Sequence, residues 1–375
     1  MIRPRKAIER LKKYRPPLEG RGGKLRLDFN ENTVGCDPAV ARALRRLFRP
    51  EWLSRYPEYE EGRSELARHF GVRREELLLA NGTDDAIKMI CDAFVDPGDT
   101  LLVPAPTFPV YEFFHHVAGG RVLRVRYDEH FRLPLREIVA ALRRTRVRWA
   151  AFANPNNPTG TSIPPCDLRA ILEAAPRTVV LVDEAYCDFS GETVLPWIRK
   201  YENLIVTRTF SKAFGLAALR MGFLMANRNL AEMIHRAQNP FAVNSVALVS
   251  ACEAVRHSEF ARAYAAQARA SRSMLTRKLD AMGIPYVPSA ANFVLTRVGD
   301  RASEIARRLR KKGILVRDWN YDPHLRGYLR FTVGSAAQTR RLIRELEALT
   351  GLVESRDGRK AWRDLTAFSS TGWFA

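Results

Sequence analysis

The chain has 375 residues, 46% of them hydrophobic, which is enough for a large core and predicts one large domain with a smaller one. No apolar run is long enough to cross a membrane, and the basic N-terminal segment lacks the apolar stretch of a secretory signal, so export is not expected. The five dispersed cysteines form no CxxC pair, which argues against a disulfide framework or a metal site and favours a reduced, cytoplasmic protein.

The formal net charge of +20 raises the question of nucleic-acid binding. A nucleic-acid binder usually concentrates its basic residues on one face or in one tract. Here arginine is spread along the chain, as in segments 141–148, 304–313 and 339–349, where the spacing is typical of polar helix faces. We therefore expect a solvated basic surface that attracts anionic substrates, and no nucleic-acid site.

From about residue 60, helical and extended patterns alternate along the chain. Continuous Val/Leu/Ile strands between helices indicate a mostly parallel sheet covered on both faces. Ligands of such sheets bind beyond the carboxyl ends of the strands, which is where the polar motifs fall. The expected helices are 61–72, 83–95, 108–119, 136–145 and 166–175, and the expected strands are 76–82, 99–106, 121–127, 148–155, 178–186 and 203–211.

The C-terminal third has the pattern of a second, smaller unit. A long helix is expected over about 255–282, and it leads into alternating extended and helical segments. These are an extended segment at 285–298, a helix at 301–312, strands at 313–319 and 328–334, and a closing helix at 336–349. The tail 351–375 shows no periodicity, and its role is left open.

Lys212 lies among hydroxyl side chains in the segment TRTFSKAFGLAALRMG, residues 207–222. Taken alone, it reads as an ordinary solvated charge at the start of a helix. A lysine that acts as a nucleophile forms a Schiff base with a carbonyl substrate or with pyridoxal 5′-phosphate. That cofactor also requires a partner for its ring nitrogen and an anion cup for its phosphate, so both features can be sought in the sequence.

The anion cup has two candidate halves. Thr83 and Asp84 follow a glycine where a strand turns into a helix, so free backbone N–H groups and the helix dipole favour a phosphate there. Such junctions are common, and Thr83 reads equally well as a helix cap. The second half is the lysine segment itself, in which Thr209 and Ser211 offer hydroxyls and Arg220 offers a bidentate fork.

Three more polar or aromatic positions follow strand ends. Asp183 closes an apolar strand, with Tyr186 shortly after it, and its ordinary role would be to start a turn. Asn157 lies in the loop ANPNNPTG, which on its own indicates a pair of turns. Phe108 also follows a strand end, where it would either stack on a cofactor ring or pack in the core.

The order of these motifs is more specific than any one of them. RYPEYEEGRSELARHFG, NGTDDAI, PAPTFPVY, NPNNPTG, VDEAY, SKAFGLAALRMGF and YLRFTVG follow one another between residues 55 and 334, within a likeness that covers roughly residues 25–350. In this order they resemble the fold type I pyridoxal-phosphate-dependent aminotransferases of class I/II. The resemblance implies an α/β fold, in which a large domain with a mostly parallel seven-stranded sheet, sandwiched by helices, is joined to a smaller α+β domain.

With that fold we divide the chain into an N-terminal arm and part of the small domain (1–47), a large cofactor-binding domain (48–270), a C-terminal small domain (271–350) and the tail (351–375). The resemblance implies pyridoxal 5′-phosphate as cofactor. It also implies a homodimer with shared sites, because Tyr56 matches a tyrosine that reaches the neighbouring subunit's cofactor phosphate.

The family's roles carry over to matching positions of this chain. Lys212 would bond the cofactor aldehyde and move the substrate proton, and Asp183 would pair with the ring nitrogen. The other cofactor contacts implied are Tyr186 and Asn157 at the ring hydroxyl, Phe108 stacked on the ring, and Thr83, Asp84, Thr209, Ser211 and Arg220 around the phosphate.

Within the family, the combination of LDFNEN, RYPEYEEGRSELA, KKGILVRDW and LRFTVG is most similar to the histidinol-phosphate aminotransferases. That likeness implies transfer of the amino group of L-histidinol phosphate to 2-oxoglutarate in histidine biosynthesis. Arg330 would hold the substrate's acidic group, and it would form the substrate site with Tyr14, Asn157 and Arg317. The chain departs from the family pattern at Ala218, where glycine is common, at Phe108-Pro109, and in the tail.

Three other functions remain open at this point. An aromatic amino acid aminotransferase and a decarboxylase that acts on threonine phosphate would share almost every motif. A non-catalytic regulatory protein built on this fold is disfavoured because it would be expected to carry a DNA-binding domain or to lack Lys212.

Overall fold

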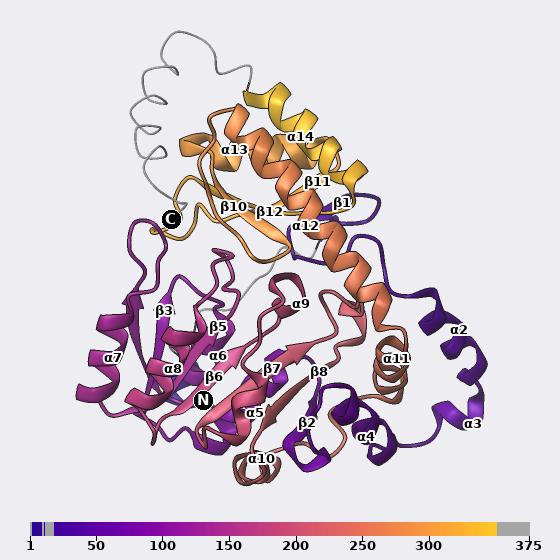
Figure 1. Ribbon diagram of the computed structural model, residues 1–375, viewed down its shortest axis with the longest axis vertical. Helices are drawn as coiled ribbons and strands as arrows, with labels where there is room; N and C mark the ends of the chain where they lie inside the picture. Colours follow the sequence, from indigo (N-terminus) through magenta and orange to yellow (C-terminus); the bar gives the residue numbers. More distant parts are fainter. Residues whose placement is uncertain (1, 10, 12–18, 351–375) are drawn as a thin grey trace.

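The computed structural model describes residues 2–9, 11 and 19–350, so Tyr14 and the tail 351–375 lie outside the described residues. Its strands form two sheets, and helices pack around them, as Figure 1 shows. The helices are α1 (Lys6–Glu9), α2 (Pro38–Leu47), α3 (Pro50–Leu53), α4 (Glu60–His69), α5 (Thr83–Phe94), α6 (Val110–Val117), α7 (Leu135–Arg144), α8 (Pro165–Ala174), α9 (Cys187–Ser190), α10 (Arg228–His235), α11 (Ser245–Arg256), α12 (Ser258–Ala281), α13 (Ala302–Lys311) and α14 (Ala336–Thr350). The strands are β1 (Leu25–Leu27), β2 (Leu77–Ala80), β3 (Thr100–Ala105), β4 (Arg121–Arg126), β5 (Val147–Ala153), β6 (Val179–Asp183), β7 (Leu204–Thr209), β8 (Gly222–Ala226), β9 (Tyr286–Val287), β10 (Phe293–Arg297), β11 (Ile314–Asp318) and β12 (Tyr328–Thr332).

The larger sheet has seven strands in the order β2-β8-β7-β6-β5-β3-β4. Its pairs are parallel except those that involve β8, which runs antiparallel to both β2 and β7. The expected mostly parallel, seven-stranded sheet is therefore confirmed. The sequence analysis missed β8 and ended the series at 203–211, because its short apolar run continues directly from the polar motif after β7.

Side-chain alternation along the strands creates a core on each face of this sheet. On β7, Leu204 and Val206 pack into one hydrophobic cluster and Ile205 into the other. Helices α5, α6 and α10 close the second cluster, whereas α7 and α8 contribute to the first. Because both faces are covered, the strand ends are where polar groups can reach a ligand.

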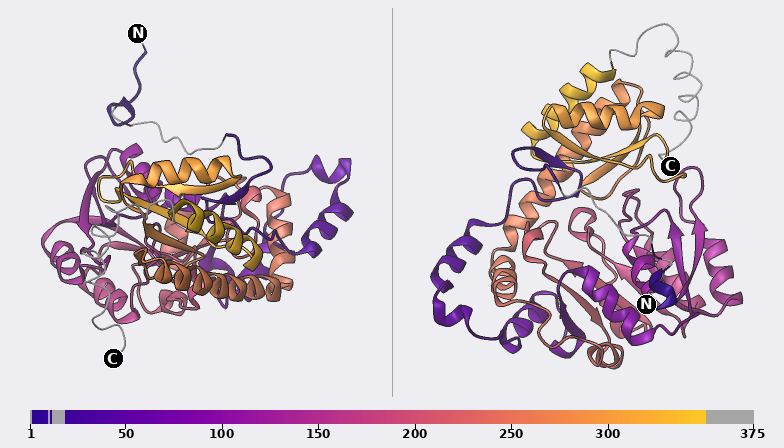
Figure 2. Two further views of the ribbon diagram at one scale, coloured as in Figure 1. Left: turned by 90° about the horizontal axis from the view of Figure 1, so that it is seen from above. Right: turned by 180° about the vertical axis from the view of Figure 1, so that it is seen from behind.

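The smaller sheet has the order β1-β11-β12-β10-β9 and lies across the strand ends of the larger one (Figure 1). Its edge strand β1 pairs in parallel with β11, so residues 25–27 belong to this sheet. Helix α12, 24 residues long, runs between the two halves, and the turned view of Figure 2 shows the same arrangement. The boundary expected at residue 270 falls within α12, and the division into domains stays a prediction.

A buried histidine joins helix α6 to three strands or their ends. His115 is fully buried, and Trp149 donates its indole N–H to His115 Nδ1 at 3.0 Å. Its Nε2 therefore carries the hydrogen and faces the carbonyls of Asp99 and Arg121 at 3.0 and 2.9 Å. A Cβ on Gly120 would lie 2.1 Å from that nitrogen, so only glycine fits there. Burial lowers the pKa of His115, and the ring is neutral in the fold.

The lowered pKa of His115 predicts that the folded protein becomes less stable in mild acid. Its pKa is lower in the folded than in the unfolded chain, so the unfolded state binds more protons as the pH falls below about 6.5. The free energy of unfolding should therefore decrease from pH 7.5 to 5.5, and less steeply in His115→Gln. Urea unfolding at several pH values measures both slopes, and equal slopes would contradict the prediction.

Candidate active site

One cavity of about 640 Å³ opens between the strand ends of the larger sheet and strands β11 and β12 of the smaller one. It gathers nearly all of the residues that the sequence analysis selected from separate motifs. Those that line it are Thr83, Asp84, Phe108, Asn157, Asp183, Tyr186, Thr209, Ser211, Lys212, Arg220, Arg317 and Arg330.

Lys212 lies in the turn after β7 and not at the start of a helix. Its Nζ donates a hydrogen bond to the carbonyl of Phe29 at 2.9 Å and lies 5.5 Å from the ring centroid of Tyr186. No salt bridge holds this amine among the described residues. It is therefore held loosely, by a neutral acceptor, inside the cavity.

Asp183 ends β6 and is 4% exposed. Its carboxylate accepts hydrogen bonds from Tyr111 Oη at 2.6 Å, Thr207 Oγ1 at 3.0 Å and the backbone N–H of Ala185 at 3.2 Å. Burial raises the pKa of Asp183, while these donors lower it. Within the described part of the chain, no arginine or lysine forms a salt bridge with it. A buried carboxylate with only neutral donors can accept a cationic partner from a ligand.

Tyr111 is a functional candidate that the sequence analysis did not select. Burial and the neighbouring Asp183 raise the pKa of this tyrosine, so it remains a hydrogen-bond donor. It follows Phe108 by three positions, and the two rings meet edge to face with centroids 5.6 Å apart. That spacing places both near the first turn of α6, and it was the available signal in the motif PAPTFPVY.

The anion cup forms where β2 passes into α5. Thr83 is the first residue of α5 and Gly82, at φ +81°, precedes it, so the expectation that Thr83 caps the helix is not met. A Cβ on Gly222 would lie 2.7 Å from the backbone nitrogen of Thr83, and therefore two glycines let the chains approach here. The backbone N–H groups at the start of this 12-residue helix have no acceptor within the helix, and this arrangement suits the binding of an anion.

Side chains of the segment that contains Lys212 complete the anion cup. Arg220 Nη1 lies 3.5 Å from Ser211 Oγ and its Nη2 lies 3.3 Å from Asp84 Oδ2. The hydroxyl of Thr209 donates to the carbonyl of Met221 at 3.3 Å and accepts from the N–H of Ser211 at 3.0 Å. Thr209 thus shapes the turn, while Arg220 and Ser211 remain placed to bind an anion.

Two arginines face each other across β11 and β12, where Arg317 is the register partner of Arg330. Arg330 is 4% exposed, and it donates to the carbonyl of Asp28 at 2.6 Å and to Asn157 Oδ1. Its Nε is buried and finds no hydrogen-bond partner among the described residues. Burial lowers the pKa of Arg330 to about 10, and Arg317 acts in the same direction. Like charges placed opposite each other are unfavourable, so this pair is arranged to receive an anion.

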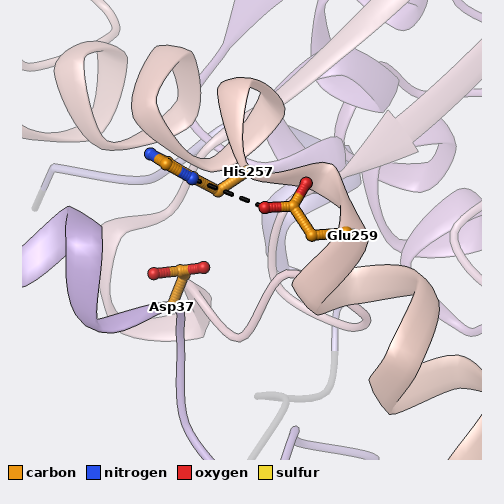
Figure 3. A group of neighbouring side chains, drawn as sticks. All are labelled: Asp37, His257 and Glu259. Atoms are coloured by element: carbon orange, nitrogen blue, oxygen red, sulfur yellow. Dashed lines mark ion pairs between the residues drawn. The ribbon is translucent and has the colours of Figure 1, made fainter.

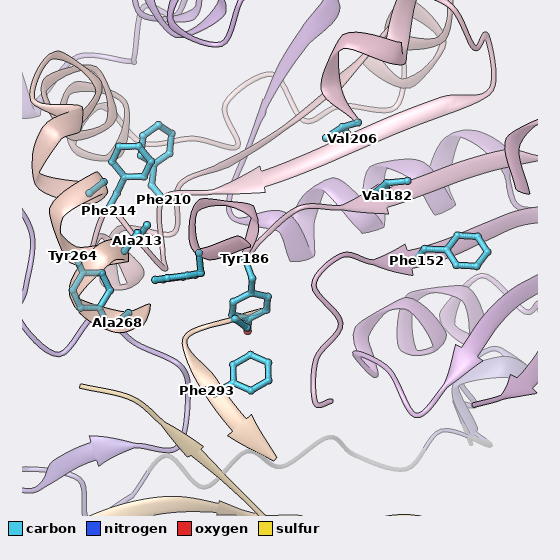
Figure 4. Close-up of a cluster of buried hydrophobic side chains, with 14 of the residues drawn as sticks. Phe152, Val182, Tyr186, Val206, Phe210, Ala213, Phe214, Tyr264, Ala268 and Phe293 are labelled. Carbon is cyan, nitrogen blue, oxygen red and sulfur yellow. The ribbon is translucent and has the colours of Figure 1, made fainter. Parts of the chain in front are cut away.

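Tyr186 packs its ring edge to face against Phe293, with centroids 5.2 Å apart, as Figure 4 shows. Its hydroxyl accepts a hydrogen bond from Asn30 Nδ2 at 2.9 Å. Tyr56 is the one described candidate that does not line the cavity. It is 76% exposed and contacts Phe241, with ring centroids 4.6 Å apart.

These groups fit a cofactor with an aldehyde, a protonated ring nitrogen and a phosphate. Lys212 supplies an amine, Asp183 an uncompensated buried carboxylate, and the start of α5 with Arg220 an anion cup. The three features lie in one cavity, so the residues present match pyridoxal 5′-phosphate.

A second cluster of titratable groups lies outside the cavity (Figure 3). Asp37 caps α2 by accepting from the N–H of Ala39 at 2.6 Å. Near it, His257 Nδ1 lies 3.5 Å from Glu259 Oε1 at the junction of α11 and α12. We interpret these contacts as a helix cap beside a surface ion pair.

The described helices include none that is both long enough and apolar enough to span a membrane.

The chain is similar to known proteins over most of its length. The family profile described as Aminotransferase class I and II matches residues 23–346. The chain is 34% identical to a histidinol-phosphate aminotransferase of Caldanaerobacter subterraneus subsp. tengcongensis over 92% of this chain and 98% of that protein. It is 35% identical to one of Geobacillus sp. over 94% and 95%. The crystal structure of a histidinol-phosphate aminotransferase from Sinorhizobium meliloti in complex with pyridoxal-5′-phosphate superposes with a TM-score of 0.83 and 26% identity, covering 97% of this chain and 99% of that one.

The anion cup predicts that inorganic phosphate stabilises the fold. A dissociation constant near 1 mM would add about 1.4 kcal/mol at 10 mM phosphate, which raises the melting temperature of a chain of this length by about 2 °C. Thermal unfolding in phosphate and in chloride of equal ionic strength measures the difference. Arg220→Leu should lose most of it, whereas Arg124→Leu, an exposed partner of Glu112 outside the cavity, should keep it. An undiminished shift in Arg220→Leu would place the anion elsewhere.

Proposed function

The chain belongs to the class I and II aminotransferases and is an enzyme of that kind, and from this premise we propose that it transfers the amino group of L-histidinol phosphate to 2-oxoglutarate with pyridoxal 5′-phosphate. The observation that carries the proposal is that two separate groups of hydrogen-bond donors suited to anions line one cavity. The start of α5 with Arg220 forms one, and Arg317 with Arg330 forms the other. Lys212 lines the same cavity.

The cofactor would occupy the half of the cavity built by the larger sheet. Lys212 would bond its aldehyde, Asp183 would hold its protonated ring nitrogen, and Phe108 would stack on the ring. Tyr186 and Asn157 would contact the ring oxygen, while Ser211, Arg220 and the N–H groups of Thr83 and Asp84 would hold the phosphate. When bound, the cofactor supplies an electron sink for the carbon that bears the substrate amine.

The protein's own groups then position the substrate and move a proton. Lys212 Nζ would act as the base that removes the proton from the substrate carbon next to the amine, and would return it in the later step. The carbonyl of Phe29, 2.9 Å from that nitrogen, keeps the free amine inside the cavity. Asp183 would face the ring nitrogen, and Tyr111 and Thr207, which donate to its carboxylate oxygens, would hold it in place.

The arginine pair gives the preference for an acidic substrate. A phosphate monoester approaching Arg317 and Arg330 would relieve their mutual repulsion and satisfy the buried Nε of Arg330. The carboxylate of 2-oxoglutarate can use the same guanidinium groups in the second half of a ping-pong cycle. Trp319 and Tyr321, stacked with centroids 5.6 Å apart, add an aromatic surface beside Arg317. That surface would also suit an aromatic amino acid, which is therefore the second candidate substrate.

A half-reaction identifies the substrate. The protein is loaded with pyridoxal 5′-phosphate, and L-histidinol phosphate, phenylalanine, glutamate or threonine phosphate is added without an oxo acid. We expect the lysine-bound cofactor band to be lost fastest, and at the lowest concentration, with L-histidinol phosphate. Lys212→Ala should show no turnover, and Arg317→Gln should weaken the response to L-histidinol phosphate more than the response to phenylalanine.

Other results of this experiment would identify a different function or contradict the role of Lys212. A faster response to phenylalanine would make the protein an aromatic amino acid aminotransferase. Release of carbon dioxide from threonine phosphate, without consumption of an oxo acid, would make it a decarboxylase. Near-normal turnover in Lys212→Ala would contradict the assignment of the lysine.

We also propose that the protein acts as a cytoplasmic homodimer with shared sites. The described cysteines form no disulfide, in keeping with a reducing compartment. Tyr56 and Phe241 are 76% and 54% exposed and contact each other, which gives an apolar pair that a second subunit would cover. Tyr56 would then reach the partner's cofactor phosphate.

Subunit mixing tests the shared site. Lys212→Ala has an intact Tyr56 and Tyr56→Ala has an intact Lys212, so a mixed dimer contains one complete site if the tyrosine acts across the interface. Activity after the two variants are unfolded and refolded together should exceed the sum of the separately refolded variants. Sedimentation provides the control for dimer formation. A dimer without this gain would show that Tyr56 serves its own subunit or none.

A further inference from the structure

Asn30 lies between the two halves of the molecule, just after β1, and it is unusual in its burial and its backbone. It is 1% exposed and has φ +57°, a left-handed conformation that asparagine tolerates better than other non-glycine residues. Its backbone carbonyl accepts from Asn292 Nδ2 at 3.2 Å. The backbone is therefore fixed, and the side chain has a defined direction.

The hydrogen bonds around Asn30 determine which way its amide points. The backbone N–H of Asn30 donates to Thr332 Oγ1 at 3.1 Å, so this hydroxyl oxygen acts there as an acceptor. The hydroxyl hydrogen of Thr332 is then directed to Asn30 Oδ1, at 3.0 Å. With Oδ1 occupied by Thr332, the NH₂ group faces Tyr186 and donates to its hydroxyl oxygen at 2.9 Å.

This direction has a consequence for Tyr186. Its hydroxyl has one hydrogen, and the contact with Asn30 uses the oxygen as an acceptor. Among the described residues the hydroxyl makes no other hydrogen bond, and Tyr186 lines the cavity. The hydroxyl hydrogen is thus left for a group inside the cavity. An acceptor at the same place as Asn30 Nδ2 would instead draw that hydrogen out of the cavity.

We infer that Asn30 is a positioning residue that directs the hydroxyl hydrogen of Tyr186 into the cavity, where it donates to the ring oxygen of the cofactor. The inference rests on the proposed function, because it concerns how Tyr186 meets pyridoxal 5′-phosphate. Asn30 touches neither the substrate nor the reacting atoms in this scheme; it acts through Tyr186.

The charge on the ring oxygen makes the effect measurable. A donor stabilises the anionic form of that oxygen and so lowers the pKa of the bound cofactor. Loss of the donor raises it. Lys212 and Arg330 also lie near Tyr186, and Asp183 lines the same cavity. All three are unchanged in every variant described below.

Asn30→Asp is the informative substitution because it preserves shape. The carboxylate can still accept from Thr332, but it has no N–H for Tyr186, whose hydroxyl would turn to donate to it. Asn32→Asp is the matched control: it adds the same charge two positions away, where Asn32 donates to the carbonyl of Ala213 at 3.0 Å and does not line the cavity. Asn30→Gly permits the same backbone and removes the donor without adding a charge.

The experiment is a pH titration of cofactor absorbance in the loaded full-length protein. We expect the pKa of the bound cofactor to rise by about one unit or more in Asn30→Asp, a tenfold change in its proton affinity, and by a few tenths at most in Asn32→Asp. In a Tyr186→Phe background the same Asn30→Asp change should produce little further shift. If only the added charge matters, the shift will persist without the tyrosine hydroxyl, and the inference is overturned.

The other possible outcomes of the titration also test the role of Asn30. An unchanged pKa in Asn30→Asp, with a normal titration of the wild type, would overturn the inference and leave the proposed function standing. A wild type that shows no lysine-bound cofactor band would overturn both. If Asn30→Asp does not fold, Asn30→Gly replaces it in the same cycle with Tyr186→Phe. A rise in that variant that disappears with the hydroxyl supports the inference, and no rise contradicts it.

Discussion

The site depends on keeping a carboxylate and an amine in one cavity without letting them neutralise each other. Asp183 ends β6 and Lys212 follows the end of β7, the adjacent parallel strand, whose register pairs Thr207 with Asp183. An ion pair between them would occupy both groups, yet none forms. Tyr111 and Thr207 hold the carboxylate, and the carbonyl of Phe29 holds the amine. Neutral hydrogen-bond partners thus keep both charged groups in place for a ligand.

The cavity is complete only where the two halves of the molecule meet. The larger sheet supplies the lysine, the carboxylate and the anion cup, whereas strands β11 and β12 of the smaller sheet supply Arg317 and Arg330. The chain between β1 and α2 joins them. Its residues 28–30 contact the arginine, the lysine and the tyrosine in turn, through the carbonyls of Asp28 and Phe29 and the amide of Asn30. Movement of this segment would therefore shift the contacts of Arg330, Lys212 and Tyr186.

Two buried ionisable groups show how a structural role differs from a functional one. His115 has a hydrogen-bond partner for each ring nitrogen within the fold, so the neutral ring is fully hydrogen-bonded. Asp183 is equally enclosed, but its partners are donors that leave its negative charge uncompensated. Arg330 is the cationic counterpart, with a buried Nε that has no hydrogen-bond partner in the part of the chain that the structure describes. Ligand-binding groups therefore differ from core groups less in their burial than in having a charge or a hydrogen-bonding atom that the protein leaves unpaired.

The sequence by itself determined what depends on neighbours along the chain. The alternating helices and strands, the glycine before α5 and the placement of Lys212 and Asp183 at strand ends all follow from local periodicity and turn chemistry, and the structure confirms them. Only the tertiary structure decided the contacts of Tyr111 with Asp183 and of Asn30 with Tyr186, whose members are 72 and 156 positions apart. It also decided the antiparallel direction of β8 and the register that sets Arg317 opposite Arg330. No local pattern encodes which distant segments pair, because pairing is settled by how the sheets and helices bury their apolar faces together.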